Sequence, residues 1–360
     1  MFTPSRLTLA RQKRGLTKKE LAEKLDLNAQ TITNFESEIT KEEPSEKTLE
    51  RIACVLGFPV SFFCKEKVDF EPAESASFRA LSKMTSAQRN SSIASGILAF
   101  EVNNWFEKKF ELPTHNLPDL RNETPESAAT YIRQMWLLGE KPINNIIHLL
   151  ESKGIRVFFI AEDNRNVDAF SIWNNGQPFI LLNTFKSSER SRFDAAHELG
   201  HLLLHKHGVP RDRKAEQDAN SFASAFLMPQ SSVIAQVPSL PTIQNLIKLK
   251  HYWLVSLSAI VYRLKVLNLI SEWQHRNLVI EINSKGYNIN EPYSIQKESS
   301  QIFAKLFAFL NEEGITSSMI ANEIGISNRD FQKLTTGISE IIGGNIGSKK
   351  QSNANLKRIK

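Results

Sequence analysis

The sequence contains little cysteine and no long apolar run. Its 360 residues include two cysteines, Cys54 and Cys64, which lack metal-ligand spacing. This scarcity excludes a disulfide-stapled secreted scaffold and a cysteine-rich zinc finger. No run of about eighteen apolar residues occurs, which excludes an ordinary transmembrane helix, and residues 1–6 lack the apolar core of a signal peptide. We therefore expect a cytoplasmic protein with reduced thiols and no membrane partner.

The charge balance is mildly basic. The formal net charge is +6 at pH 7. An excess of this sign favours polyanionic partners, but part of it lies in the last twelve or so residues, so charge is weak evidence for nucleic-acid binding. The length allows about two or three domains, each with its own core.

The most informative stretch is residues 193–205, which contains the pattern H-E-x-x-H at His197, Glu198 and His201. Residues four apart lie on one face of an α-helix, so the two imidazoles can converge on one Zn²⁺. Glu198 can take a proton from a water held there, which is the general-base role in a metal-dependent hydrolase. The neighbouring alanines and leucines predict a buried helix, where these polar groups need partners.

Glu216 is our candidate for the third metal ligand. It lies near the start of a second predicted helix that Pro229 ends, and Asn220, one turn later, is expected to hold it by a hydrogen bond. Two histidines and one glutamate leave a coordination position open, as in catalytic zinc sites.

Three other residues compete with Glu216 for this role. Asp218 is the second carboxylate of the same helix, but it points about 200° away from Glu216. His205 lies roughly 12 Å along the axis from His197, so we expect it to cap the helix or support a ligand. His207 fits the last position of the metzincin spacing H-E-x-x-H-x-x-G-x-x-H, but Leu204 stands where that pattern needs glycine.

Residues 5–60 predict five short helices that include a helix-turn-helix. Thr17 and Glu20 form a capping box at the start of its first helix, and a turn at residues 26–28 leads into residues 29–36. In such a motif the second helix enters the major groove of DNA. The alternative is a small helical domain that mediates dimerisation or binds protein.

Five residues of this motif are candidates for DNA contacts. Gln30, Thr31, Thr33 and Asn34 lie on the second helix and carry amides or hydroxyls suited to base edges. Lys18 begins the preceding helix and is placed for phosphates. We therefore expect double-stranded DNA as a partner.

A small β-sheet is predicted before the H-E-x-x-H helix. Residues 155–160, 169–173 and 178–183 have strand-like composition, and residues 174–177 form a hairpin turn between the last two. An edge strand beside a peptidase site can hold an extended substrate by backbone pairing. Residues 179–183 are the hypothesised edge strand.

Two further helical regions have no assigned chemistry. Residues 93–106 predict a long amphipathic helix for which core packing is favoured over a bridge between the DNA-binding and peptidase parts or a homodimer seam. Residues 299–338 contain a helical pair with the rhythm of a helix-turn-helix. Its second helix is short, so packing or dimerisation is favoured over DNA reading.

Two segments resemble known families. Residues 190–201, the Glu216-x-x-x-Asn220-x-Phe222-Ala223 pattern and Leu227-Met228-Pro229 resemble the ImmA/IrrE zinc peptidases. This resemblance implies Zn²⁺ as cofactor, His197, His201 and Glu216 as ligands and Glu198 as catalytic base. In that family the substrates are repressors of the XRE type, cut in response to stress or a mobile-element signal.

The N-terminal segment resembles XRE (Cro/C1-type) repressor domains, although Lys18 stands where that family often has glutamine. The predicted fold is mainly α with a small β-sheet, combining a five-helix helix-turn-helix domain, a zincin-like α+β metallopeptidase domain and a C-terminal helical appendage. The expected segments are a DNA-binding domain (1–64), a linker (65–75), a metallopeptidase domain with helical flanks (76–292), a C-terminal helical region (293–342) and a disordered tail (343–360).

Two functions are consistent with these patterns. The first is a DNA-associated zinc peptidase that regulates transcription by cleaving an XRE-type repressor or itself. The second is a non-proteolytic XRE regulator, including a toxin–antitoxin or phage-lysogeny component, whose zinc domain acts as sensor or scaffold. Glu198 favours the first, because metal binding alone does not need a carboxylate at that position.

Overall fold

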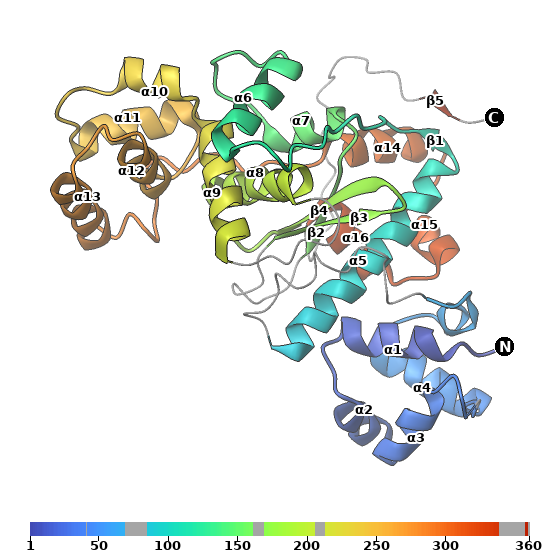
Figure 1. The fold of residues 1–360 in the computed structure, drawn as a ribbon. Coiled ribbons are helices and arrows are strands. Elements are labelled where there is room, and N and C mark those ends of the chain that lie inside the picture. The colour runs from blue at the N-terminus through green and yellow to red at the C-terminus, as the bar shows by residue number, and fades with distance from the viewer. Residues whose placement is uncertain (41, 69–84, 161–168, 206–212, 338–356, 359–360) are drawn as a thin grey trace. The chain divides into compact units, whose positions relative to one another are not determined.

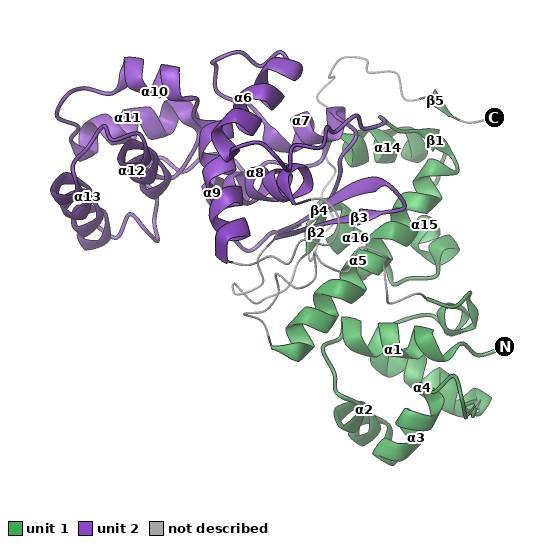
Figure 2. Ribbon diagram, viewed as in Figure 1, with its two compact units in different colours: residues 1–113, 158–167, 301–360 green, residues 114–157, 168–300 purple. Residues whose placement is uncertain are grey.

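The computed structural model describes residues 1–40, 42–68, 85–160, 169–205, 213–337 and 357–358 (Figure 1). These residues form two compact units (Figure 2). Unit 1 comprises residues 1–113, 158–167 and 301–360, and unit 2 comprises residues 114–157 and 168–300. Unit 1 therefore draws on both ends of the sequence. The predicted mainly α fold with a small sheet is confirmed.

The N-terminal part of unit 1 is a bundle of short helices. They are Pro4–Lys13 (α1), Lys18–Leu25 (α2), Ala29–Phe35 (α3), Glu46–Leu56 (α4) and the 3₁₀ helix Val60–Cys64 (η1). The capping box forms as predicted, because Thr17 accepts a hydrogen bond from the backbone N–H of Glu20 and the Glu20 carboxylate accepts one from the N–H of Thr17. Leu7, Leu21 and Ile32 are fully buried between the helices.

The rest of unit 1 is built around a long helix. Ser86–Glu107 (α5) contains the predicted amphipathic stretch and buries Leu98, Val102 and Phe106. The C-terminal helices are Gln301–Glu312 (α14), Ser317–Ile324 (α15) and Asn328–Thr336 (α16). Phe106 contacts the rings of Phe303, Phe307 and Phe331, so this part of α5 is a packing face within the chain.

Two expected segments fall largely outside the described residues. Of the expected linker, residues 69–75 are not described. Of the expected disordered tail, only Lys357–Arg358 (β5) is described, and it pairs antiparallel with Phe110–Glu111 (β1).

Unit 2 is mostly helical. Its helices are Pro125–Met135 (α6), Ile146–Ser152 (α7), Ser188–Leu204 (α8), Arg213–Leu227 (α9), Gln230–Gln236 (α10), Ile243–Trp253 (α11), Leu257–Val266 (α12) and Glu272–Ser284 (α13). Helix α8 packs against α9, and α9 also packs against α6. Among the described helices of the whole chain, none combines the length and apolar character that crossing a membrane requires.

A three-stranded sheet lies against α8. It contains Arg156–Ile160 (β2), Phe170–Asn174 (β3) and Gln177–Asn183 (β4) in the order β2-β4-β3. Strands β3 and β4 form the predicted hairpin, with Asn175 and Gly176 both at positive φ, as a two-residue turn of type I′ requires.

The hypothesis that residues 179–183 form an edge strand is wrong. They belong to β4, which lies between β2 and β3 and uses both sides for strand pairing. Phe179 to Asn183 are all buried, which fits a central strand covered on both faces. The edge strands are β2 and β3, one on each side of β4.

Candidate metal centre and DNA-binding face

Helix α8 supplies the two histidines and the glutamate of the H-E-x-x-H pattern. Ser187 caps the helix by accepting a hydrogen bond from the N–H of Arg190, and His197 and His201 follow three turns later on one face. Their Nε2 atoms are 3.0 Å apart. Two ring nitrogens this close repel each other through their lone pairs unless a proton or a cation lies between them.

Glu216 on α9 completes a group of three ligands. Its carboxylate oxygens lie 3.4 Å from Nε2 of His197 and 3.4 Å from Nε2 of His201. One ligand atom from each of the three residues lies within 4.8 Å of the other two. Hydrogen bonds from His197 and His201 hold the pKa of Glu216 far below its usual range. The Glu216 side chain is therefore an ionised carboxylate.

A glycine allows α9 to approach α8 at this point. A Cβ atom added to Gly200 would lie 3.0 Å from the ring of Phe222 on α9. Because a side chain there would crowd the ring, glycine in the middle of α8 permits the close packing that brings Glu216 to the histidine pair.

The other ring nitrogen of each histidine has its own partner. Asn220 accepts a hydrogen bond of 3.1 Å from Nδ1 of His197. Nδ1 of His201 lies 3.0 Å from Nδ1 of His205. A cation held by this group would take the place of the protons between the rings and Glu216, with the ring protons on the Nδ1 atoms and both Nε2 lone pairs directed at the ion.

These contacts agree with some of the expectations for the residues near the histidine pair and disagree with others. His205 caps α8 and contacts a candidate ligand, as expected. Asn220 supports His197, whereas we expected it to hold Glu216. Asp218 is outside the three-residue group, and His207 lies outside the described residues.

The donor set fits a zinc ion. Ligands held at about 2.0–2.1 Å in tetrahedral geometry are roughly 3.3 Å apart. The three separations of 3.0, 3.4 and 3.4 Å match this spacing. The side chain of Glu216 is 43% exposed, so water can reach the group from that side.

The candidate DNA-binding residues lie on α2 and α3 of unit 1. Gln30 donates to Asn34 at 2.9 Å, and Asn34 donates to Glu42 at 2.8 Å, which forms an exposed chain of side chains. Thr31 is half-buried. This chain occupies amide groups that base reading would require.

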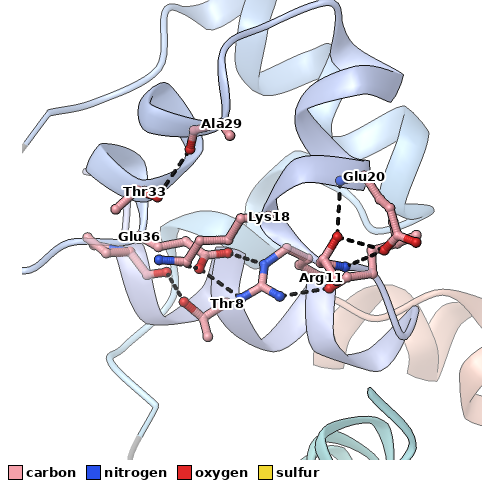
Figure 3. Close-up of polar contacts among 10 residues, drawn as sticks. Thr8, Arg11, Lys18, Glu20, Ala29, Thr33 and Glu36 are labelled. Carbon is pink, nitrogen blue, oxygen red and sulfur yellow. Dashed lines mark hydrogen bonds and ion pairs between the residues drawn. The ribbon is translucent and has the colours of Figure 1, made fainter. Parts of the chain in front are cut away.

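The remaining two candidates also have partners within the domain (Figure 3). Thr33 donates to the carbonyl of Ala29, one turn back, at 3.1 Å. Lys18 lies 3.7 Å from Glu36, which is held by Arg11, and is 41% exposed. Lys18 thus remains able to reach a phosphate.

Comparison with known families gives two matches. Residues 150–265 match the model of the IrrE N-terminal-like domain, of peptidase family M78. Residues 7–63 match a helix-turn-helix model. The chain joins an XRE-type helix-turn-helix domain to an ImmA/IrrE-like domain. A search of curated proteins gives no match.

In the ImmA/IrrE-like domain, Ser171 is a site residue that the sequence analysis missed. Its hydroxyl on β3 donates to Glu198 Oε2 at 2.7 Å, and both residues are at least 98% buried. The only signal was one small polar residue inside the apolar strand of residues 169–173. Because the partners are 27 positions apart, no local pattern links them.

Buried ion pairs brace α8 of the same domain. Lys250 on α11 is fully buried, donates to Glu189 at 2.8 Å and lies 3.7 Å from Glu291. Burial raises the pKa of Glu189, but the hydrogen bond from Lys250 and others outweigh it, so the net shift is downward. For Glu291, burial dominates and raises the pKa. This network anchors the first turn of the helix that carries His197.

Proposed function

We propose that the protein is a zinc-dependent peptidase that regulates transcription, with an XRE-type repressor as substrate. The observation that carries this proposal is the convergence of two histidines and Glu216, with the buried Glu198 on the same helix as the histidines. A structural site needs no general base, whereas hydrolysis does.

The roles follow from the contacts of each residue. His197, His201 and Glu216 would hold the ion, with Asn220 and His205 fixing the orientation of the rings. A zinc ion held there would supply Lewis-acid activation of the scissile carbonyl and of a water. Glu198 then accepts a proton from the attacking water and delivers it to the leaving amine.

Ser171 and β3 support the two reactants. The Ser171 hydroxyl donates to one oxygen of Glu198, which fixes the orientation of the carboxylate. Strand β3 is an edge strand in the order β2-β4-β3, and edge strands are the ones to which extended peptides add by backbone hydrogen bonds. Substrate pairing would then occur next to the catalytic base.

The test compares cells that produce the wild type or Glu198→Gln. Glutamine keeps the shape of the side chain but cannot accept the proton, so zinc content should stay equal and proteolysis should fall by about 10²- to 10⁴-fold. Profiling of new protein N-termini would reveal the substrate, and termini within the chain itself would reveal self-cleavage. Asp218→Asn is the control for loss of one carboxylate.

The opposite outcome identifies the second function. If Glu198→Gln leaves the set of protein termini and the regulated transcripts unchanged, the metal domain acts as a sensor or scaffold and the peptidase proposal is wrong.

A further inference from the structure

The three C-terminal helices of unit 1 repeat the first three helices of the chain. Helices α2 and α15 have the same length of eight residues, and α14 precedes α15 as α1 precedes α2. Helices α2 and α15 begin at Lys18 and Ser317, and helices α3 and α16 begin at Ala29 and Asn328. The distance in sequence between the two members is the same for both pairs.

The turns between these helices are also the same. At both places the backbone takes positive φ at the same two positions, and a polar side chain caps each following helix. The N–H of Leu27 bonds to the carbonyl of Ala22, and the N–H of Ile326 bonds to that of Ala321. The matched pairs are Gly15 and Gly314, Thr17 and Thr316, Asp26 and Gly325, and Asn28 and Ser327.

The same positions are buried in both copies. The pairs are Leu21 and Ile320, Ala22 and Ala321, Leu25 and Ile324, Ile32 and Phe331, and Phe35 and Leu334. The equal length of α2 and α15, the matched turns and the matched core positions make residues 301–337 a second helix-turn-helix module. We call it the C-terminal module.

The start of α16, the second helix of the C-terminal helix-turn-helix, contacts the N-terminal domain. Asp330, the counterpart of Thr31, is 2% exposed and accepts hydrogen bonds of 2.8 and 2.6 Å from Arg14. Arg14 also donates to the carbonyls of Leu56 and Gly57, which end α4. In helix-turn-helix proteins the first residues of this helix contact base edges. In the C-terminal module the corresponding residue, Asp330, is bound to Arg14.

Lys65 of the N-terminal part covers the turn between α15 and α16. The Lys65 ammonium group donates to the carbonyl of Ile324 at the end of α15. A Cβ atom at Gly325 would lie 2.8 Å from Cε of Lys65. Gly325 therefore serves both the left-handed backbone and the close approach of Lys65, whereas its counterpart Asp26 has a side chain.

The charges of the C-terminal module do not suit DNA. Lys18 and Lys19 are replaced by Ser317 and Ser318 at the start of the first helix. The module contains three basic residues (Lys305, Arg329, Lys333) and four acidic ones (Glu312, Glu313, Glu323, Asp330). Phosphate contacts supply most non-specific DNA affinity, and this balance does not favour them.

We infer that the C-terminal module is a helix-turn-helix whose reading surface binds the N-terminal DNA-binding domain of the same chain instead of DNA. Arg14 and Lys65 of the N-terminal part take the place of a nucleic-acid partner, with Asp330 and the α15 carboxyl end as their acceptors. The module thereby holds the DNA-binding domain within unit 1.

The first test uses the full-length protein and a labelled pool of duplexes with random central sequence. Gln30→Ala with Thr33→Ala should weaken binding about tenfold. The matched change in the C-terminal module, Arg329→Ala with Gln332→Ala, should alter it less than about twofold. A loss from the second pair equal to that from the first would overturn the inference.

The second test measures hydrogen exchange in the full-length protein. Asp330→Asn keeps the side-chain shape but removes the charge that Arg14 binds, so exchange should rise about tenfold or more in α16 and also at the ends of α1 and α4. Glu323→Gln is the control, because its pair with Lys109 is exposed. Unchanged exchange in α1 and α4 would show that the module does not hold the N-terminal domain.

A further variant guards against misfolding of Asp330→Asn. Lys65→Met removes the contact with the Ile324 carbonyl and leaves Asp330 intact. Faster exchange in both η1 and α15 is the expected result, and an increase in η1 alone would contradict the inference.

Discussion

The candidate metal centre and the candidate DNA-reading helix both use side chains of helices, but these side chains are held differently. Glu198 and His201 are 2% and 3% exposed, and each has a partner beyond the metal-facing group. Gln30 and Asn34 are bonded to each other and to Glu42 at the surface. Catalysis needs fixed atoms, whereas base reading requires these surface bonds to be exchanged for bonds to DNA.

Removal of Glu216 should produce the largest difference between the two regions. Glu216→Ala deletes one of three proposed ligands, so metal affinity should fall by more than the roughly 10- to 100-fold that a lost supporting residue costs. Metal analysis after dialysis would measure this, while DNA affinity should not change. Asp218→Ala on the same helix is the control, and equal metal loss in both variants would refute the ligand assignment.

Removal of Lys250 should destabilise unit 2 strongly. Lys250→Met leaves Glu189 buried without its cation, which should cost about 3–5 kcal/mol of unfolding free energy. Denaturant unfolding would measure it. The exposed Lys248→Met on the same helix should cost little, and adding Glu189→Gln to Lys250→Met should recover part of the loss. No recovery would mean that the ion pair does not explain the effect.

Removal of Asn220 should affect the metal centre without deleting a ligand. Asn220→Ala removes the hydrogen bond that orients the His197 ring, so metal affinity should drop about 10- to 100-fold. Competition with a chelator would quantify the change. Gln217→Ala, an exposed change on α9, should leave affinity unaltered; a wild-type value for Asn220→Ala would mean that ring orientation does not depend on this bond.

The smallest expected effect is at the DNA-reading face. Glu42→Gln removes a negative charge and weakens the hold on Asn34, so DNA should bind about two- to fivefold more tightly at low salt. Titration with the random duplex pool would detect it. Glu43→Gln is the control, because it removes a negative charge at the neighbouring position and leaves the hydrogen bond between Asn34 and Glu42 intact. Equal gains from both would indicate a general charge effect instead of release of Asn34.

Local patterns predicted the elements well. The Thr17 capping box, the Asn175-Gly176 turn and the H-E-x-x-H helix depend on residues within a few positions of one another, and the structure contains all three. Backbone geometry and hydrogen bonding within one turn decide such features, so neighbouring residues are sufficient evidence.

Relations between elements were predicted less well. Residues 179–183 were expected at the sheet edge because their composition is that of a strand, but strand order depends on pairing with distant segments. Asn220 was expected to hold Glu216 because they are one turn apart, but packing of α9 on α8 turns it towards His197. No local sequence pattern indicated the hydrogen bond between Ser171 and Glu198.

The sequence by itself determined which residues are candidates for chemistry: the histidine pair and glutamate of one helix, Glu216, and the polar residues of the helix-turn-helix. Helical periodicity, capping and resemblance are local properties, and they are complete in the sequence. Tertiary structure alone decided that β4 is the central strand and β3 an edge strand, that Ser171 supports Glu198, and that Asp330 meets Arg14 across most of the chain length. These contacts depend on how separate elements pack, because side chains distant in sequence meet only after the elements have formed a common core.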